Sequence, residues 1–379
     1  MKKEVLVFVV NVDWFFISHR LPIALAAISE GYDVHLITND TGGGDDLRKL
    51  GIQVHHVPFS RSGNKIIGEL RSIISLRKLL KDISPNIIHS VTIKAVIYSG
   101  LCLHTFNQKP AFVAAISGLG YVFSAKNLRA LITKLLASFL YRLAFRHQLK
   151  KVIFQNTTDE KVLSTVTKLA ACQKVMIKGS GADLELYNYC LEPETEKLKV
   201  VMACRLLKEK GVYEYIKAAE KVGATHNNVE FLLAGAPDDG NPNSISKKEL
   251  ENWAEKGVIT LLGHCTNISE VFSDSHIVTL PSYYGEGVPK VLIEAAACGR
   301  PIITTNNPGC RDTVIDHETG ILIPIRDANA LANALTKLID DKELRLRMGI
   351  RAREYAVSEF DINSVISEHL KIYKELTHS

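Results

Sequence analysis

The second half of this 379-residue chain contains Tyr283-Tyr284-Gly285-Glu286-Gly287-Val288-Pro289-Lys290-Val291-Leu292-Ile293-Glu294. This stretch follows the apolar run 276–280, which is typical of a buried strand. Pro289 suits the first position of a helix, so we predict a helix from Pro289 to Gly299. Gly285 and Gly287 allow the backbone to approach a ligand closely, and the N–H groups at a helix start favour an anion. A strand, a glycine-containing turn and a helix in this order are typical of an α/β domain.

The same alternation of short apolar runs and amphipathic helical segments continues in both directions from this stretch. Continuous apolar runs separated by helices indicate parallel strands that helices cover on both faces. The predicted strands are 5–10, 34–37, 54–57, 86–89, 112–116, 151–154 and 175–177 before residue 180, and 198–203, 229–233, 258–261, 276–280, 301–304 and 321–323 after it.

A polar segment near the middle of the chain, 179–197, interrupts the pattern with Gly-Ser-Gly, several acidic residues and Pro193. We therefore predict two doubly wound α/β domains, 1–180 and 181–379, with a last helix at about 359–376 that can pack back on the first domain. Two such domains that face each other form a central cleft, and ligands of open α/β sheets bind beyond the carboxyl ends of the strands.

The composition agrees with two globular domains and excludes several classes of protein. A chain of 379 residues is too long for one ordinary domain. With 46% hydrophobic and 23% charged residues, it is not disordered, collagen-like or a disulfide scaffold. Its 46 Lys and Arg residues against 41 Asp and Glu residues give a net charge of +5, which is too small to indicate a nucleic-acid partner.

The cysteines and the N-terminus indicate a cytoplasmic location. The seven cysteines form no Cys-x-x-Cys pair, so we expect thiols in a reducing compartment, without a disulfide framework or a zinc site. The apolar run 5–10 is too short for a signal peptide or for a helix that spans a membrane.

The two carboxylates of the opening stretch suit a sugar-nucleotide ligand. Glu286 precedes the predicted helix and Glu294 lies inside it, with seven residues between them. A carboxylate beside a phosphate site is tolerated when it accepts hydrogen bonds from hydroxyls, as the acidic residue of dinucleotide sites does from ribose. The alternative is that Glu286 is a solvated loop charge and Glu294 a helix-surface residue. The adjacent turn and helix start favour the ligand-binding interpretation.

This arrangement resembles the Glu-x7-Glu motif of the retaining, two-domain (GT-B) glycosyltransferases of family 4. Other segments that are similar to the family are Ala203-Cys204-Arg205-Leu206-Leu207-Lys208-Glu209-Lys210-Gly211, Leu233-Ala234-Gly235, Leu262-Gly263, Pro308-Gly309-Cys310-Arg311-Asp312 and Thr319-Gly320. Cys204 stands where the family usually has Gly. Four segments resemble the bacterial members that extend polyprenyl-diphosphate-linked oligosaccharides for O-antigen, capsule or glycoprotein glycans. They are Asp13-Trp14, Ser18-His19-Arg20-Leu21-Pro22, Ser117-Gly118-Leu119-Gly120-Tyr121 and the Gly309-Cys310-Arg311-Asp312 run named above.

The resemblance implies a GT-B fold of two Rossmann-like domains, of which 1–180 would bind the acceptor and 181–379 the nucleotide sugar. It also implies a role for each charged residue. Arg205 and Lys210 would bind the diphosphate of a nucleotide-sugar donor, which we expect to be UDP-linked. Glu286 would contact the transferred sugar and Glu294 the ribose. Two fixed cations can stabilise the negative charge that grows on the leaving diphosphate. The other residues expected to contact the donor are Gly287, Val288 and Pro289.

By the same resemblance, the reaction would be a retaining transfer of a hexose or N-acetylhexosamine, GalNAc or GlcNAc favoured, to a polyprenyl-diphosphate-linked saccharide. Retention in this family is usually explained by front-face attack, in which the leaving phosphate takes the proton of the acceptor. No metal or other cofactor is expected, because the sequence contains no Asp-x-Asp, the carboxylate pair that holds a divalent ion in the other large glycosyltransferase fold.

The residues on the acceptor side are less defined. Asp13 is the best carboxylate for holding or deprotonating the acceptor, and a cap for the following helix is an equal alternative. Many family members carry a His after the fifth strand, where this sequence has Ser117 and Gly118.

Nearby histidines could replace that missing group. His19 and His89 are the candidates, although a lone His is more often structural. The other residue expected at the acceptor side or its loops is Arg20.

Two segments of the first half combine basic and apolar residues. The segments 65–81 and 127–151 are predicted as helices that bind an anionic membrane surface, with Lys and Arg outward and apolar residues inserted. This would place the protein peripherally on the inner face of the cytoplasmic membrane. The alternative for each is a core-packed helix with a solvated basic face.

Two other functions fit the same fold. One is a sugar-nucleotide 2-epimerase, which would turn over the donor without an acceptor. The other is a non-catalytic module that binds a sugar nucleotide or a lipid-linked glycan. The combination of Arg205, Lys210, Glu286 and Glu294 favours transfer over both.

Overall fold

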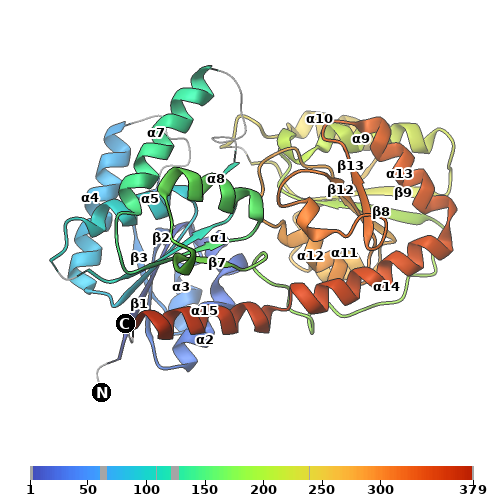
Figure 1. Ribbon diagram of the computed structural model, residues 1–379. Coiled ribbons are helices and arrows are strands. Elements are labelled where there is room, and N and C mark those ends of the chain that lie inside the picture. Colours follow the sequence, from blue (N-terminus) through green and yellow to red (C-terminus); the bar gives the residue numbers. More distant parts are fainter. Residues whose placement is uncertain (1–2, 60–65, 108, 121–127, 239, 378–379) are drawn as a thin grey trace. The chain divides into compact units, whose positions relative to one another are not determined.

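The computed structural model describes residues 3–59, 66–107, 109–120, 128–238 and 240–377. The chain forms two compact units, one of Met1–Ser180 together with Asn363–Ser379, and one of Gly181–Ile362. Each unit is an open parallel β-sheet with helices on both faces (Figure 1).

The sheet of the first unit has seven parallel strands in the order β3-β2-β1-β4-β5-β6-β7. The chain adds strands in one direction from β1 to β3 and in the other from β4 to β7, so the direction changes between β1 and β4. The strands are β1 Val5–Val12, β2 Asp33–Asn39, β3 Gln53–His56, β4 Ile87–Val91, β5 Ala111–Ile116, β6 Lys150–Phe154 and β7 Lys174–Met176.

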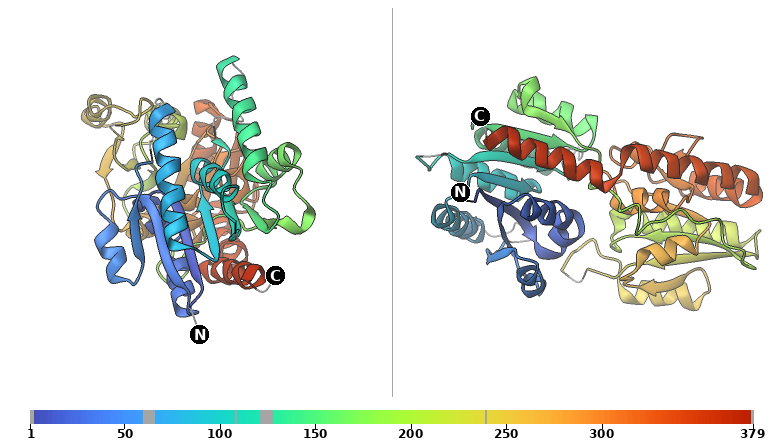
Figure 2. Two further views of the ribbon diagram at one scale, coloured as in Figure 1. Left: turned by 90° about the vertical axis from the view of Figure 1, so that its left-hand side faces the viewer. Right: turned by 90° about the horizontal axis from the view of Figure 1, so that it is seen from below.

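Helices form a layer on each face of this sheet, as the two views of Figure 2 show. One apolar core lies under α4 (Ile66–Ile83), α5 (Ile93–Leu103), α7 (Leu128–Ala144) and α8 (Thr157–Thr167). The other lies under α1 (Asp13–His19), α2 (Leu21–Ser29), α3 (Gly44–Lys49) and α15 (Ile362–Thr377). A short 3₁₀ turn, Ala171–Gln173, precedes β7.

The last helix, α15, completes the first unit rather than the second. Its apolar residues Val365, Ile372, Tyr373 and Leu376 lie in the same core as the first strand. The Tyr373 hydroxyl is also 2.6 Å from Nδ1 of the buried His89 on β4. α15 begins at Ile362, three residues after the preceding helix ends.

The sheet of the second unit has six parallel strands in the order β10-β9-β8-β11-β12-β13, and its direction changes between β8 and β11. Its strands are β8 Leu198–Ala203, β9 Val229–Ala234, β10 Thr260–Gly263, β11 Ile277–Leu280, β12 Ile302–Thr305 and β13 Gly320–Ile323. Its helices are α9 Val212–Gly223, α10 Lys247–Glu255, α11 Ile268–Ser273, α12 Lys290–Ala297, α13 Ala328–Asp340 and α14 Lys342–Glu359, with 3₁₀ turns at Lys208–Lys210 and Arg311–Thr313.

The prediction of two doubly wound parallel sheets is confirmed, and every predicted strand overlaps an observed one. The predicted helix 127–151 was wrong after residue 144, because α7 ends at Ala144 and Lys150 begins β6. Lys150 is buried and donates to the carbonyl of His147, and Lys151 forms a 2.9 Å ion pair with Glu375. Neither lysine therefore belongs to a basic helix face. Lys65 and Asn127, at the starts of the two segments, lie outside the described residues.

The described residues contain no helix with the length and apolarity needed to cross a bilayer.

Candidate active site

The predicted donor residues of the second unit lie at the point where its sheet changes direction. β8 and β11 are adjacent, with Val200 opposite Ile277 and Val201 opposite Val278. The loop 204–211 therefore leaves the sheet next to the loop 281–289. Ligands of open α/β sheets bind at such switch points.

The structure brings Lys210 and Glu286 into direct contact across this point. Lys210 Nζ lies 2.5 Å from Glu286 Oε1, and the two side chains are only 15% and 13% exposed. Burial alone would lower the pKa of the Lys210 ammonium. The charge of Glu286 and its hydrogen bond outweigh burial, so the pKa lies above its usual value and Lys210 stays protonated.

Ser282 also holds Glu286, and the sequence contained no signal for this role. The buried Ser282 hydroxyl donates to Glu286 Oε1 at 2.9 Å. Lys210 and Ser282 therefore contact the same oxygen of the carboxylate.

Arg205 lies at the rim of the same loop cluster. Its side chain is 52% exposed, and Nη1 is 3.7 Å from Oδ2 of Asp238. The guanidinium is therefore accessible to a ligand that approaches the loop after β8.

Glu294 is buried inside α12, where its side chain is 7% exposed and forms a 2.9 Å ion pair with Lys290. Burial raises the pKa of the Tyr187 hydroxyl. The charge of Glu294, and the hydrogen bond between Tyr187 and Glu294, raise this pKa further. Lys290 and Tyr187 thus surround the predicted ribose carboxylate, and neither had been assigned a role. The surface alternative for Glu294 does not fit its burial.

The start of α12 differs slightly from the prediction. Pro289 has a ψ of 118° in the extended region and is the N-cap residue, so the helix begins at Lys290 and ends at Ala297. The side chain of Val288 is buried in the apolar core, so only its backbone can face a ligand.

Two glycines allow the loops of this cluster to contact each other through their backbones. Gly309 has a φ of +84°, and a Cβ there would lie 1.5 Å from the carbonyl oxygen of Gly287. Gly211 has a φ of +85°, and a Cβ there would lie 2.2 Å from the carbonyl oxygen of Pro281. No other residue type fits at either position without moving the backbone.

Hydrogen bonds hold the same loops in place. The Tyr283 N–H donates to the carbonyl of Glu209 at 3.0 Å. The side chains of Thr305 and Asn307, after β12, donate to the carbonyls of Ser282 and Tyr284. The three loops therefore form one preorganised cluster around the Lys210–Glu286 pair, as electrostatic stabilisation of a reacting group requires.

In the first unit, Asp13 anchors a neighbouring loop. The buried carboxylate accepts hydrogen bonds from the N–H groups of Trp14, Thr41 and Gly43 and from the Thr41 hydroxyl, at 2.5–2.9 Å. Burial raises the pKa of Asp13, but these bonds outweigh it and leave the pKa below its usual value. The predicted alternative of a helix cap was wrong, because the N-cap residue of α1 is Val12 and Asp13 is the first residue of the helix. A role in holding or deprotonating the acceptor stays a prediction.

His19 and Arg20 do not lie together at one surface. His19 is half-buried at the end of α1, and its ring stacks on Phe15 with centroids 4.1 Å apart. Arg20 is almost fully buried, and burial lowers the pKa of its guanidinium to about 10. Arg20 therefore lies in the core of the first unit.

His89 is also a core residue. Its side chain is fully buried against Tyr373, and burial holds its pKa well below the usual value. The structural interpretation of this histidine is the one that its surroundings support. Ser117 and Gly118 follow β5, with Gly118 at a φ of +97°, while Tyr121 lies outside the described residues.

No cluster of three His, Cys, Asp or Glu side chains suited to a metal ion occurs in the described part of the chain. The metal independence of the reaction remains a prediction.

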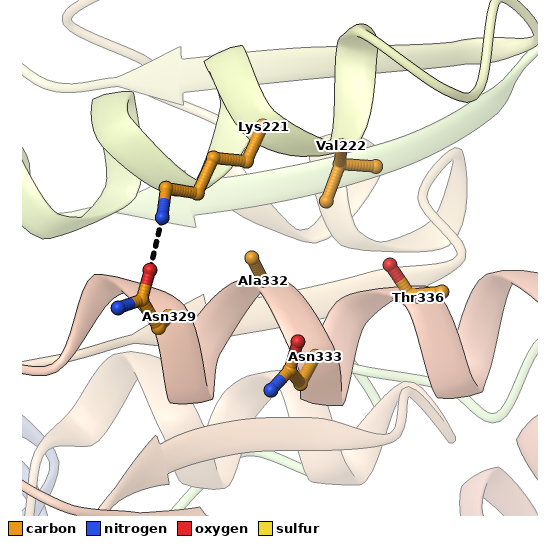
Figure 3. A pocket seen from close by; sticks show the side chains of 6 residues that line it. All are labelled: Lys221, Val222, Asn329, Ala332, Asn333 and Thr336. Atoms are coloured by element: carbon orange, nitrogen blue, oxygen red, sulfur yellow. Dashed lines mark hydrogen bonds between the residues drawn. The ribbon is translucent and has the colours of Figure 1, made fainter.

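A separate pocket lies between α9 and α13 of the second unit (Figure 3). Lys221 of α9 donates a hydrogen bond to Asn329 of α13 across it. None of the predicted donor residues lines this pocket.

Two family models match the chain. Residues 5–156 match the model described as glycosyl transferase 4-like, and residues 191–355 match the model described as glycosyl transferases group 1.

Characterised relatives match nearly the whole chain at low identity. One is the N,N'-diacetylbacillosaminyl-diphospho-undecaprenol alpha-1,3-N-acetylgalactosaminyltransferase of Campylobacter jejuni, which is 27% identical over 94% of this chain and 97% of that protein. Another is the UDP-Gal:alpha-D-GlcNAc-diphosphoundecaprenol alpha-1,3-galactosyltransferase of Escherichia coli, which is 24% identical over 92% of this chain and 90% of that protein.

Solved structures share the fold. Sucrose-phosphate synthase from Thermosynechococcus elongatus superposes with a TM-score of 0.80 at 19% identity, over 99% of both chains. The Anabaena protein Alr3699/HepE, in complex with UDP and glucose, gives a TM-score of 0.77 at 16% identity, over 97% of this chain and 99% of that chain.

Proposed function

This chain belongs to the GT-B glycosyltransferases, and on that premise we propose that it transfers a hexose or N-acetylhexosamine from a UDP-sugar to a polyprenyl-diphosphate-linked saccharide. The transfer proceeds with retention and without a metal, in the synthesis of a bacterial surface polysaccharide. GalNAc and GlcNAc are the favoured sugars.

The contact between Lys210 and Glu286 carries this proposal. It pairs a cation suited to the leaving diphosphate with a carboxylate suited to sugar hydroxyls, at the switch point of one unit. Arg205, half-exposed on the same loop as Lys210, supplies a second cation.

The names of the relatives support the choice of acceptor and donor. Both relatives named above act on sugars linked to undecaprenol through a diphosphate, and one uses UDP-Gal. The transferred sugars in those names are N-acetylgalactosamine and galactose, which supports a hexose or N-acetylhexosamine for this chain.

The reaction proposed here needs no carboxylate nucleophile. As the bond between the sugar and the diphosphate breaks, Lys210 and Arg205 stabilise the charge that develops on the leaving group. The acceptor hydroxyl attacks from the same face, and its proton passes to an oxygen of the departing phosphate. Glu286 binds hydroxyls of the transferred ring.

Membrane attachment through α4 and α7 is part of this proposal, because the acceptor is a lipid. Three apolar residues of α4 are 54–68% exposed and five of α7 are 51–64% exposed. Patches of this kind on a soluble fold mark sites of interaction, and the basic residues of both helices suit anionic lipids at the inner face of the cytoplasmic membrane. The exposed residues are Ile67, Leu70 and Ile74 on α4 and Leu131, Ile132, Leu135, Leu136 and Phe139 on α7.

The test is a screen of UDP- and GDP-sugars against short-chain polyprenyl-diphosphate-sugar acceptors, with mass analysis of the products. We expect one added sugar, dependent on both substrates, and its loss in Lys210→Met. Lys221→Met, on α9 and outside the loop cluster, is the matched control. Epimerised donor without an acceptor, or donor binding without turnover, would contradict the proposal.

A further inference from the structure

Two free cysteines of the second unit, Cys190 and Cys298, lie against each other although they are far apart in the sequence. The Cys190 N–H donates a 3.4 Å hydrogen bond to the carbonyl of Cys298. A backbone hydrogen bond of this kind holds two Cα atoms about 5–6 Å apart, and a disulfide requires less than about 7 Å. The backbone separation therefore already suits a disulfide bond.

The two thiols also converge on one hydroxyl. Cys190 Sγ lies 3.4 Å from Oγ of Ser273, the last residue of α11. The Cys298 thiol makes a hydrogen bond with the same Ser273 side chain. Both cysteine side chains thus point to one place, and joining the sulfurs requires side-chain rotation rather than movement of the backbone.

Two arginines hold the segment of Cys190 against the end of α12. The almost fully buried Arg300 donates from Nη2 to the carbonyl of Cys190 at 2.7 Å. Arg353 donates from Nη1 to the carbonyls of Tyr187 and Ala297, at 2.8 and 2.7 Å. These bonds fix the segment beside the helix before any covalent link forms, so a disulfide here costs little reorganisation.

The two thiols differ in their reactivity. Cys190 is partly exposed, whereas Cys298 is buried at the C-cap of α12. Burial raises the pKa of the Cys298 thiol to about 12, and the charge of Arg300 offsets this only in part. Because the thiolate is the reactive form, we expect Cys190 to react first with an outside reagent and Cys298 to act as the second, resolving thiol.

We propose that Cys190 and Cys298 form a reversible disulfide when the protein meets a small-molecule disulfide such as glutathione disulfide. The Cys190 thiolate attacks one sulfur of the reagent, forms a mixed disulfide and releases one glutathione thiolate. The Cys298 thiolate then attacks the Cys190 sulfur and releases the second glutathione. The reagent gains the two electrons that the cysteines lose, and the two cysteine protons end on the two glutathione thiols. In a reducing compartment such a bond is transient and responds to the redox state.

The disulfide would also strengthen the surroundings of the predicted ribose carboxylate. Tyr187, which hydrogen-bonds to Glu294, lies three residues before Cys190. Glu294 lies one helical turn before Cys298, whose N–H donates to the Glu294 carbonyl at 3.1 Å. The new bond would therefore hold both sides of this contact together under oxidising conditions.

The test treats the full chain with glutathione disulfide, blocks the remaining thiols by alkylation and maps the peptides by mass spectrometry. The peptides of Cys190 and Cys298 should be joined to each other, and dithiothreitol should separate them. The melting temperature of the oxidised protein should rise on the order of 5 °C, because the bond closes a long loop of the unfolded chain. None of these measurements needs a substrate, so the result does not depend on the proposed function.

Three variants complete the test. Cys298→Ala should stop at the mixed disulfide, with glutathione on Cys190, and Cys190→Ser should show neither the linked peptides nor the rise in melting temperature. Cys265→Ser is the matched control, because Cys265 is also a half-exposed cysteine of the second unit, and it should form the link like the unmodified protein. An unmodified protein that keeps glutathione on Cys190 beside a free Cys298, or that links Cys190 to another cysteine, would overturn the inference.

Discussion

The Lys210 ammonium and the Glu286 carboxylate lie 2.5 Å apart although they come from loops after different strands. The Glu286 carboxylate keeps Lys210 protonated. The positive charge that we propose for binding the diphosphate therefore depends on the carboxylate that we propose for binding the sugar. Neither residue can be changed without altering the electrostatics of the other.

We expect Lys210→Met and Arg205→Ala to lower kcat on the order of 100-fold, because each removes a charge that stabilises the leaving diphosphate. The donor KM should also rise, because the diphosphate is already charged in the ground state. Full donor titrations at saturating acceptor would measure both constants.

The coupling of the pair can be measured in a double-mutant cycle. Glu286→Gln should lower kcat, and the combined Lys210→Met, Glu286→Gln variant should lose less than the sum of the two single losses. Strict additivity would show that the 2.5 Å contact has no role in turnover. Lys221→Met should match the unmodified enzyme throughout.

Glu294→Gln should raise the donor KM about tenfold with little change in kcat, because a ribose contact differs little between ground and transition state. Lys290→Met should change the donor KM as well, through the loss of the 2.9 Å ion pair that orients Glu294. An effect of Glu294→Gln on kcat alone would place this carboxylate at the reacting centre instead of the ribose.

The product should be α-linked when the donor is α-linked, and EDTA should leave the rate unchanged. NMR of the purified product gives the anomeric configuration, and assays with EDTA and with added manganese test the metal. An inverted product, or activity that is lost on chelation and restored by manganese, would contradict the proposed mechanism.

Leu135→Asp with Leu136→Asp should release the protein from vesicles that contain anionic lipid, because two of the exposed apolar side chains of α7 would then be charged. Lys134→Glu should weaken binding mainly at low salt, where surface attraction is least screened. Sedimentation with vesicles measures both effects. Ile350→Asp, at an exposed apolar position of α14, should bind like the unmodified protein. If the unmodified protein ignores such vesicles at low salt, the membrane proposal is wrong.

The buried histidines of the first unit predict a loss of stability in acid. Burial lowers the pKa of His369 to about 3 and that of His89 well below its usual value, and the charge of Arg20 lowers both further. Since the unfolded chain takes up these protons near pH 6.5, stability is complete above that pH and falls as the pH drops through it. The melting temperature should therefore decrease between pH 7 and pH 5. His369→Gln should flatten this dependence, and an equal slope in this variant would exclude the histidine as its source.

Much of the fold could be predicted because apolar runs such as 5–10 are continuous and each is too short for a helix. The helix predicted at 127–151 extended too far, because β6 begins with lysines that continue the basic pattern of α7. Lys150 is held in the core by a local carbonyl, which no charge pattern reveals.

The charged site residues could be found from their motif, but their partners could not. Ser282 and Tyr187 act on Glu286 and Glu294 through contacts that form only in the folded unit. The function of Asp13 likewise depends on the loop at Thr41, 28 residues away in the sequence. Motif spacing identifies the candidate residues for ligand binding, while the groups that orient them have no fixed spacing.

The place of α15 in the first unit has a consequence for biosynthesis. Val365, Ile372, Tyr373 and Leu376 are synthesised after the whole of the second unit, yet they cover a face of the sheet that was made before it. Because domains generally fold as they are synthesised, Gly181–Ile362 can complete its fold while the N-terminal sheet still waits for its final helix. A nascent chain that stalls before residue 363 would therefore leave one apolar face of the first sheet uncovered until α15 is made.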